Sequence, residues 1–164
     1  MNVLSTQVQS TRRRASGPIT PAYAKRVEAR TYRVEEANQV LPEVRRLTER
    51  IVALTGELPE LEDELRIAEY RAHRPGASAP DQRRYEEGLK RLRSAEQELV
   101  GAAGRLDDLG VQLKDASTGL VDFLSYQEGE LIELCWQLGE DEVSFWHRIG
   151  EGYAGRKPIQ ARRR

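Results

Sequence analysis

The sequence predicts an α+β protein, mainly α-helical, in which a long antiparallel helical hairpin is followed by a small antiparallel β-sheet. Apolar residues recur at alternating steps of three and four over residues 44–68, and again in steps of three and four over residues 85–113, which is typical of the apolar seam between paired helices. After residue 118 the apolar spacing changes to two, which is typical of strands. Only 38% of the 164 residues are hydrophobic and 32% are charged. This composition suits elongated helices with one apolar stripe each better than a thick core.

Four segments follow from these patterns. Residues 1–30 mix Ser, Thr, Gly, Pro and Arg without periodicity, so we expect a mobile basic arm. Residues 31–116 form the hairpin, with a loop near residues 72–80 where two prolines end the helical pattern. Residues 117–155 form the β unit with an aromatic core, and residues 156–164 form a basic tail.

The first helix is expected to begin near Val34, because Glu35 and Glu36 place acids at the positive end of the helix dipole. Pro42 lies too deep in the pattern to be the first residue of that helix. We therefore expect a kink or a fresh helix start at Pro42, and a second bend at Pro59.

The second helix is expected over residues 81–115, with Asp81 as its N-terminal cap. Because a short loop joins the two helices, their apolar stripes can cover each other only in an antiparallel hairpin.

Two strands are expected in the β unit, over residues 119–126 and 130–138, with a turn at residues 127–129. If the turn places Tyr126 opposite Gly129, Asp122 lies opposite Glu133 and beside Cys135. Residues 141–149 fit either a third strand or a short helix.

The net charge of −1 hides a segregation of charge along the chain. Residues 1–30 and residues 156–164 each carry a net charge of +5, which leaves −11 on the remaining 125 residues. Basic tails of this kind either contact an anionic partner such as nucleic acid or keep the protein soluble. The candidate anion-binding residues are Arg12, Arg13, Arg14, Arg156, Lys157, Arg162, Arg163 and Arg164.

Membrane and secreted classes do not fit the sequence. No apolar run reaches the roughly 18–20 residues that span a bilayer, and no apolar stretch follows Arg12–Arg14 as it would in a secretion signal. The single cysteine, Cys135, excludes a disulfide within the chain and fits a reducing cytoplasm.

Several motifs resemble a known family. They are Gly-Leu-Val-Asp-Phe at 119–123, Leu-Cys-Trp-Gln-Leu-Gly-Glu at 134–140, Phe-Trp-His at 145–147 and Gly-Tyr-Ala-Gly-Arg-Lys-Pro-Ile at 152–159, together with Glu-Glu-Ala-Asn at 35–38 and Leu-Pro at 41–42. Over about residues 32–159 the chain resembles the uncharacterised bacterial family of the domain of unknown function number 2203.

Two positions depart from the family pattern: Leu124 stands where Pro is frequent, and Arg33 where Thr or Ser is frequent. The resemblance implies a small cytoplasmic protein and carries no activity. Its motif residues of structural interest are Trp136, Gly139, Phe145, Trp146, Gly152 and Gly155.

Cys135 and His147 are the candidate soft or borderline metal ligands of the β unit. With Asp122, Glu133 or Glu140 they can hold zinc or iron in a mixed nitrogen, sulfur and oxygen site. The spacing matches no recognised ligand motif. A third strand with odd-numbered pairing also puts His147 on the apolar face, whereas a helix at 141–149 removes that objection. The alternative is that Cys135 is simply a small buried residue, and that Asp122 makes a local hydrogen bond or pairs with Arg156.

The sequence favours a non-enzymatic interaction or scaffold protein, and no residue is assigned a catalytic role. Val40, Val52, Ile67, Val100 and Val111 lie off or beside the main seam and favour binding of a protein partner or a second copy. A metal- or cofactor-binding protein centred on Cys135 and His147 is the first alternative. Nucleic-acid association through the basic tails is the second.

Overall fold

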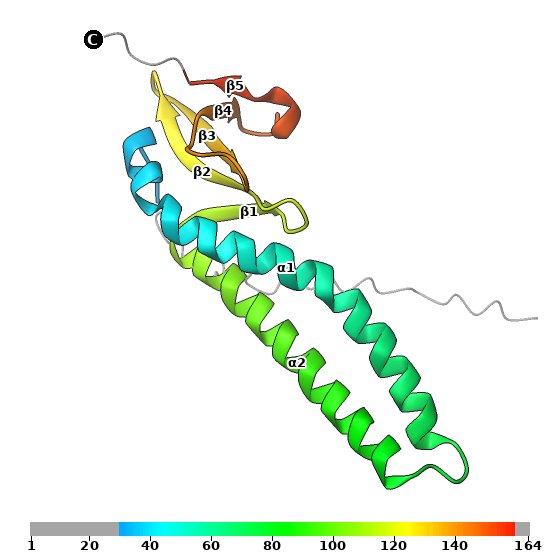
Figure 1. Ribbon diagram of the computed structural model, residues 1–164. Coiled ribbons are helices and arrows are strands. Elements are labelled where there is room, and N and C mark those ends of the chain that lie inside the picture. Colours follow the sequence, from blue (N-terminus) through cyan, green and yellow to red (C-terminus); the bar gives the residue numbers. More distant parts are fainter. Residues whose placement is uncertain (1–29, 160–164) are drawn as a thin grey trace, which may run out of the picture.

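A computed structural model describes residues 30–159, and these residues form a helical hairpin with a β-sheet at one end (Figure 1). Helix α1 covers Val34–His73 and helix α2 covers Ala79–Asp108. The sheet has five antiparallel strands in chain order: β1 (Val111–Asp115), β2 (Leu120–Gln127), β3 (Glu130–Gln137), β4 (Phe145–Arg148) and β5 (Lys157–Pro158). The predicted α+β fold with a helical hairpin is confirmed. The predictions for residues 1–29 and 160–164 lie outside the described residues.

Helix α1 runs without interruption through Pro42 and Pro59, so the fresh start expected at Pro42 is wrong. A proline inside a helix removes one backbone hydrogen bond. Here the apolar residues around Pro42, Leu41 and Val44, are buried in the core. Packing of such a face stabilises a helix more than intrinsic propensity does, and it holds α1 together across the proline.

Helix α2 begins after Ser78, not at an Asp81 cap. The Asp81 backbone N–H donates to Ser78 Oγ at 3.3 Å, and the Ser78 backbone N–H donates to Asp81 Oδ2 at 3.0 Å. Asp81 is therefore the third residue of a reciprocal capping box. The loop between the helices is confined to residues 74–78.

Helix α2 also ends earlier than expected, because residues 111–115 form β1 and not its last turn. Gly110 has φ = 75°, the left-handed conformation in which glycine commonly ends a helix. Beyond it Val111 is buried and Gln112 is exposed, an alternation typical of a strand. The sheet thus extends on both sides of the 117–155 range predicted for it.

A two-residue turn sets the pairing of β2 with β3. Glu128 and Gly129 have φ = 52° and 84°, as a type I′ hairpin turn requires, and Gln127 lies opposite Glu130. Asp122 consequently pairs with Cys135, not with Glu133 as expected. The observed register is shifted by two residues from the expected one. Because a shift of two keeps the alternation of side chains, each side chain stays on the face predicted for it.

One face of the sheet packs on the base of the hairpin and forms the core. Phe123 of β2 and Trp136 of β3 are fully buried there, together with Ile51 of α1 and Leu106 of α2. Tyr32 ties the start of α1 to this sheet, since its backbone N–H donates to the Leu124 carbonyl at 2.8 Å and its ring packs edge-on against Phe123. Among residues 30–159, neither helix is long and apolar enough to cross a membrane.

Replacing Phe123 by alanine is expected to lower the free energy of unfolding by about 3–5 kcal/mol, because it leaves a cavity in the core. Tyr126→Ala, on the same strand but with an exposed ring, is the matched control and should cost less than about 1 kcal/mol. Urea denaturation of both variants tests the assignment. Equal losses would mean that the core does not lie on the Phe123 face.

Candidate metal centre

The sheet face opposite the core buries four polar side chains. Cys135 is fully buried, and His147, Asp122 and Glu133 expose only 1%, 2% and 5% of their surface. Side chains alternate between the faces of a sheet, so Asp122 points away from the core that its neighbours Val121 and Phe123 enter. Charged groups are rarely buried to this degree unless they are paired, which makes this face the candidate site.

Strand pairing brings the four residues together. Asp122 of β2 lies opposite Cys135 of β3, and Glu133 of β3 lies opposite His147 of β4. The segment around His147 is therefore a strand, and its pairing places His147 on the polar face. The prediction that a third strand would turn His147 toward the apolar face is wrong, because His147 pairs with Glu133 and directly opposed residues of two strands point to the same face of the sheet.

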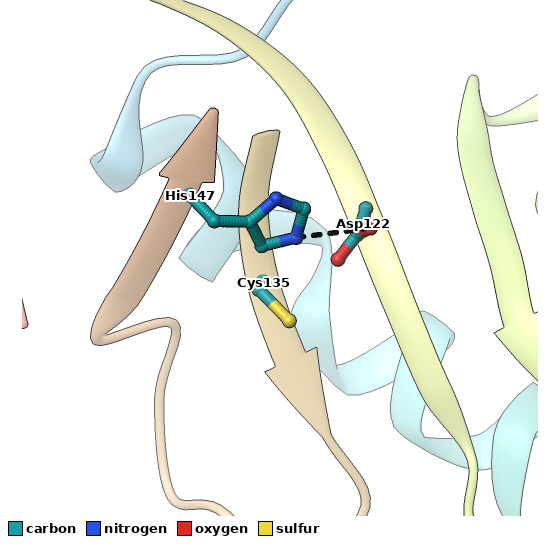
Figure 2. Close-up of side chains that lie close together, drawn as sticks. All are labelled: Asp122, Cys135 and His147. Atoms are coloured by element: carbon teal, nitrogen blue, oxygen red, sulfur yellow. Dashed lines mark ion pairs between the residues drawn. The ribbon is translucent and has the colours of Figure 1, made fainter. Parts of the chain in front are cut away.

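Asp122, Cys135 and His147 converge on one point (Figure 2). Their ligand atoms, one carboxylate oxygen, the thiol sulfur and one ring nitrogen, all lie within 4.8 Å of one another. The imidazole of His147 reaches across β3 toward β2, and its Nε2 lies 3.3 Å from Asp122 Oδ2.

The backbone fixes which nitrogen of His147 carries hydrogen. Its Nδ1 lies 2.9 Å from the Arg148 carbonyl oxygen, and a carbonyl oxygen only accepts, so Nδ1 is the donor. In the neutral ring Nε2 then presents a lone pair toward Asp122 and Cys135. A second-sphere carbonyl that holds the other nitrogen is the usual arrangement of a metal-binding histidine.

Two buried atoms of the cluster lack a hydrogen bond. His147 Nε2 is close to Asp122 Oδ2 but does not form a hydrogen bond of acceptable geometry with it, and Asp122 Oδ1 has no partner. An unsatisfied buried polar atom costs about 1–3 kcal/mol, and native proteins hold few of them. A cation bound to both atoms would satisfy them.

Lys114 of β1 and Glu133 surround this trio. Lys114 Nζ lies 2.8 Å from Glu133 Oε1 and 3.5 Å from Asp122 Oδ2, and Glu133 Oε2 lies 3.4 Å from His147 Nδ1. Burial lowers the pKa of Lys114, but the ion pairs with Glu133 and Asp122 outweigh it, so that its pKa is raised. Lys114 is therefore a permanent positive charge beside the two carboxylates.

Sequence reasoning missed Lys114 because it assigned residues 111–115 to a helix. The signal was present in the alternation of Val111 and Leu113 with Gln112 and Lys114, which is the strand pattern.

Cys135 is a poor nucleophile in this setting. Burial, and next the hydrogen bond and negative charge of Asp122, raise the pKa of its thiol above the ordinary value. Reactive cysteines are thiolates in exposed, electropositive surroundings. The thiol is thus suited to a ligand role, in which the metal itself replaces the proton.

Glu140, the remaining candidate ligand, pairs with Arg156 and is not part of the Asp122, Cys135 and His147 cluster. Arg156 donates to both of its carboxylate oxygens, at 2.6 and 2.7 Å, and its guanidinium lies 4.1 Å from the centre of the Phe145 ring. The expected pairing of Arg156 with Asp122 is therefore wrong.

The candidate anion-binding residues Arg156 and Lys157 both contact acids of their own chain. Arg156 pairs with Glu140, and Lys157 Nζ lies 3.5 Å from Glu151 Oε2. The other candidate anion-binding arginines lie outside the described residues.

The remaining motif residues shape the backbone and the core. Trp136 is buried and donates through Nε1 to the Glu140 carbonyl oxygen at 3.0 Å, and Trp146 packs against the core. Gly139 and Gly152 have φ = 105° and 62°, which other residues rarely adopt. A side chain at Gly155 would collide with Glu151.

Two hollows on the surface lie away from the cluster. One of about 390 Å³ is lined by α1 and residues 141–142, and the other, of about 420 Å³, lies between α1 and α2. Neither is lined by Asp122, Cys135 or His147. The cluster has the chemistry to hold an ion, but these hollows give it no substrate-binding space.

Fold and site together define a small α+β protein with a helical hairpin and a buried Asp–Cys–His cluster in its sheet. The chain belongs to a family of uncharacterised conserved proteins, DUF2203, whose family model matches residues 30–159. The resemblance seen in the sequence motifs is thereby confirmed. Neither a curated protein nor a solved structure matches the chain.

The raised pKa and full burial of Cys135 predict an inert thiol. At pH 8 we expect the folded protein to react with a disulfide reagent far more slowly than the protein unfolded in guanidinium, where the thiol has its ordinary pKa. Spectrophotometric thiol titration of both states measures the two rates. Equal rates would show that Cys135 is accessible and the cluster is open.

Proposed function

We propose that this protein binds one divalent transition-metal ion, zinc or iron(II), through Asp122, Cys135 and His147. The observation that carries the proposal is the buried Nε2 of His147, which lacks a hydrogen bond and faces a carboxylate and a thiol within 4.8 Å. A ring nitrogen held in this orientation by a backbone carbonyl is a preformed ligand.

The ligand set fits these metals. Imidazole nitrogen, thiolate sulfur and carboxylate oxygen are all ligands of zinc, and mixed sets of this kind also take iron. Glu133, on the Nδ1 side of His147 at 3.4 Å, supports the ring from the second sphere and does not bind the ion.

Charge balance supports the same conclusion. Asp122 and Glu133 bring two carboxylates into the buried cluster, and Lys114 is the one lysine or arginine of residues 30–159 in ion-pair contact with them. A divalent cation that displaces the thiol proton leaves the sum of formal charges on Asp122, Glu133, Cys135, Lys114 and the metal at zero. Buried charges are tolerated when they are compensated in this way.

The burial of the ligands favours a structural or sensing role over hydrolysis. A catalytic metal needs an open coordination position that substrate can reach, and the three proposed ligands expose at most 2% of their surface. An ion held by β2, β3 and β4 would link three strands and add its binding free energy to the stability of the fold. A reduced Cys135 in this role suits the cytoplasm.

An interaction role is the second candidate, and exposed apolar side chains on the hairpin favour it. Ile67 and Val100 expose 54% and 71% of their surface. Such a role needs no catalysis and is compatible with a structural metal. Nucleic-acid association through the basic tails rests on residues of which most lie outside the described part of the chain.

The protein purified without chelator is expected to carry close to one zinc or iron ion per chain, measured by elemental analysis. Metal-free protein should bind Zn²⁺ in calorimetry, and Co²⁺ should give the thiolate charge-transfer band that reports a cysteine ligand. Cys135→Ser and His147→Gln should each weaken binding by at least about tenfold.

Glu130→Gln, an exposed position of the same strand that pairs with Arg148, is the control and should bind as the wild type does. A wild-type chain that binds neither ion, or a Cys135→Ser variant of unchanged affinity, would overturn the proposal. Circular dichroism confirms that each variant is folded.

Lys114→Met is expected to bind Zn²⁺ at least about tenfold more tightly than the wild type. It removes a positive charge that contacts Asp122 Oδ2 and so competes with the metal for that oxygen. Lys114→Arg keeps the charge and should change the affinity little. In a thermal unfolding experiment, metal-free Lys114→Met should melt at a lower temperature than the metal-free wild type, because its buried carboxylates lose their counter-charge.

A further inference from the structure

A buried arginine next to the candidate metal centre carries a hydrogen-bond donor that nothing satisfies. The Arg156 side chain exposes only 9% of its surface, and charged side chains are rarely buried to this degree unless they are paired. Its Nη2 donates to both carboxylate oxygens of Glu140. Its Nε is also buried, but it has no hydrogen-bond partner among residues 30–159. Because native proteins hold few such groups, this N–H needs an explanation.

The pairing of β4 with β5 places Arg156 on the face of the polar cluster. Pro158 of β5 lies opposite Phe145 of β4, and Phe145 lies opposite Cys135 of β3. Directly opposed residues point to the same face of a sheet, so these three share a face. Arg156 lies two residues before Pro158 with extended backbone angles, φ = −58° and ψ = 133°. Residues two apart in an extended chain point to the same side, so the Arg156 side chain lies on the face that carries Cys135.

Two aromatic rings hold the guanidinium next to Cys135. Its Cζ lies 4.1 Å from the centre of the Phe145 ring and 4.7 Å from the centre of the Tyr153 ring. Since Cys135 lies between Asp122 on β2 and Phe145 on β4, a group that covers Phe145 lies beside the thiol on the side away from Asp122. The charge of Arg156 acts on this thiol. Burial and Asp122 raise the pKa of Cys135, and the guanidinium opposes them.

We propose that Arg156 is a second-sphere residue of the metal centre, whose Nε–H donates a hydrogen bond to the Cys135 sulfur when that sulfur binds the ion. The inference rests on the metal site proposed above and adds a residue to it. A thiol is a weak acceptor, so the metal-free protein leaves the Nε–H unsatisfied. Metal binding releases the thiol proton to solvent. The resulting thiolate is an anionic acceptor, and hydrogen bonds between charged partners are the strong ones.

The arrangement parallels the one at His147. There the Arg148 carbonyl accepts from Nδ1 and leaves Nε2 for the metal; here Arg156 supports the ligand sulfur. Glu140 holds the guanidinium in place before the metal binds. The pair of Arg156 and Glu140 is neutral as a whole, so it leaves the charge balance of the cluster unchanged. Loss of a second-sphere contact of this kind typically lowers metal affinity by roughly 10–100-fold.

Cobalt spectroscopy of the full-length chain tests the hydrogen bond directly. A hydrogen bond stabilises the sulfur lone pairs, so it moves the thiolate-to-Co²⁺ charge-transfer band to higher energy. Arg156→Lys keeps a positive charge to pair with Glu140 but lacks the Nε–H. It should shift the band to longer wavelength and weaken Zn²⁺ binding by at least about tenfold. Arg156→Met also removes the charge and should shift the band further.

Lys157→Met is the matched control, since it removes the positive charge of the next residue. Lys157 lies opposite Trp146, whose side chain packs against the core on the other face of the sheet, and it pairs with Glu151. Both the band and the Zn²⁺ affinity should therefore stay as in the wild type. Circular dichroism checks that each metal-free variant is folded.

The wild type and Cys135→Ser separate this inference from the metal site itself. A wild-type chain that shows no thiolate band contradicts both. If the wild type shows the band and Cys135→Ser loses it, the metal site stands, and an unchanged band in both Arg156 variants then contradicts the hydrogen bond alone. Weaker Zn²⁺ binding without a band shift contradicts it too, because that result marks a purely structural role. A shift in Arg156→Met but not in Arg156→Lys assigns the effect to charge and likewise overturns the hydrogen bond.

Discussion

The pairing of β2 with β3 is the constraint on which both the core and the polar cluster depend. A type I′ turn at Glu128 and Gly129 fixes this pairing, and the alternation of side chains then assigns every residue to a face. On one face Phe123 and Trp136 pack on the hairpin; on the other, Asp122 lies beside Cys135. A shift of one residue would exchange these faces, and it would remove the core and the cluster together.

Ion pairs with Lys114 compensate part of the negative charge that Asp122 and Glu133 bring to the buried polar face. The Lys114 ammonium group and the His147 imidazole each lie within 3.5 Å of both carboxylates, those of Asp122 and Glu133. Removing one partner of a buried ion pair is strongly destabilising, because it leaves the other charge unpaired. The complete pair nevertheless stabilises a fold less than well-packed apolar residues of similar volume would. A ligand role for Asp122, Cys135 and His147 gives a reason for keeping these polar residues in the interior of a small sheet.

The hairpin divides into two halves with different packing. Its base is covered by the sheet, so Ile51 and Leu106 are fully buried there. Its distal half has no such cover, and two helices alone cannot enclose an apolar seam. The buried polar cluster and the distal half of the hairpin consequently lie at opposite ends of the molecule (Figure 1).

By itself the sequence determined the elements that repeat a strong local pattern. The heptad spacing predicted the hairpin, the alternation after residue 118 predicted two strands, and the motif around Cys135, Trp136 and His147 pointed to the family. Local patterns set these features because they depend on residues close together along the chain. The short strand β1, and with it Lys114, was missed because five residues hold too little periodicity to outweigh the helix before them. Only the tertiary structure decided that His147 joins Asp122 and Cys135, because the convergence of β2, β3 and β4 depends on turn geometry and sheet pairing between residues up to 25 positions apart.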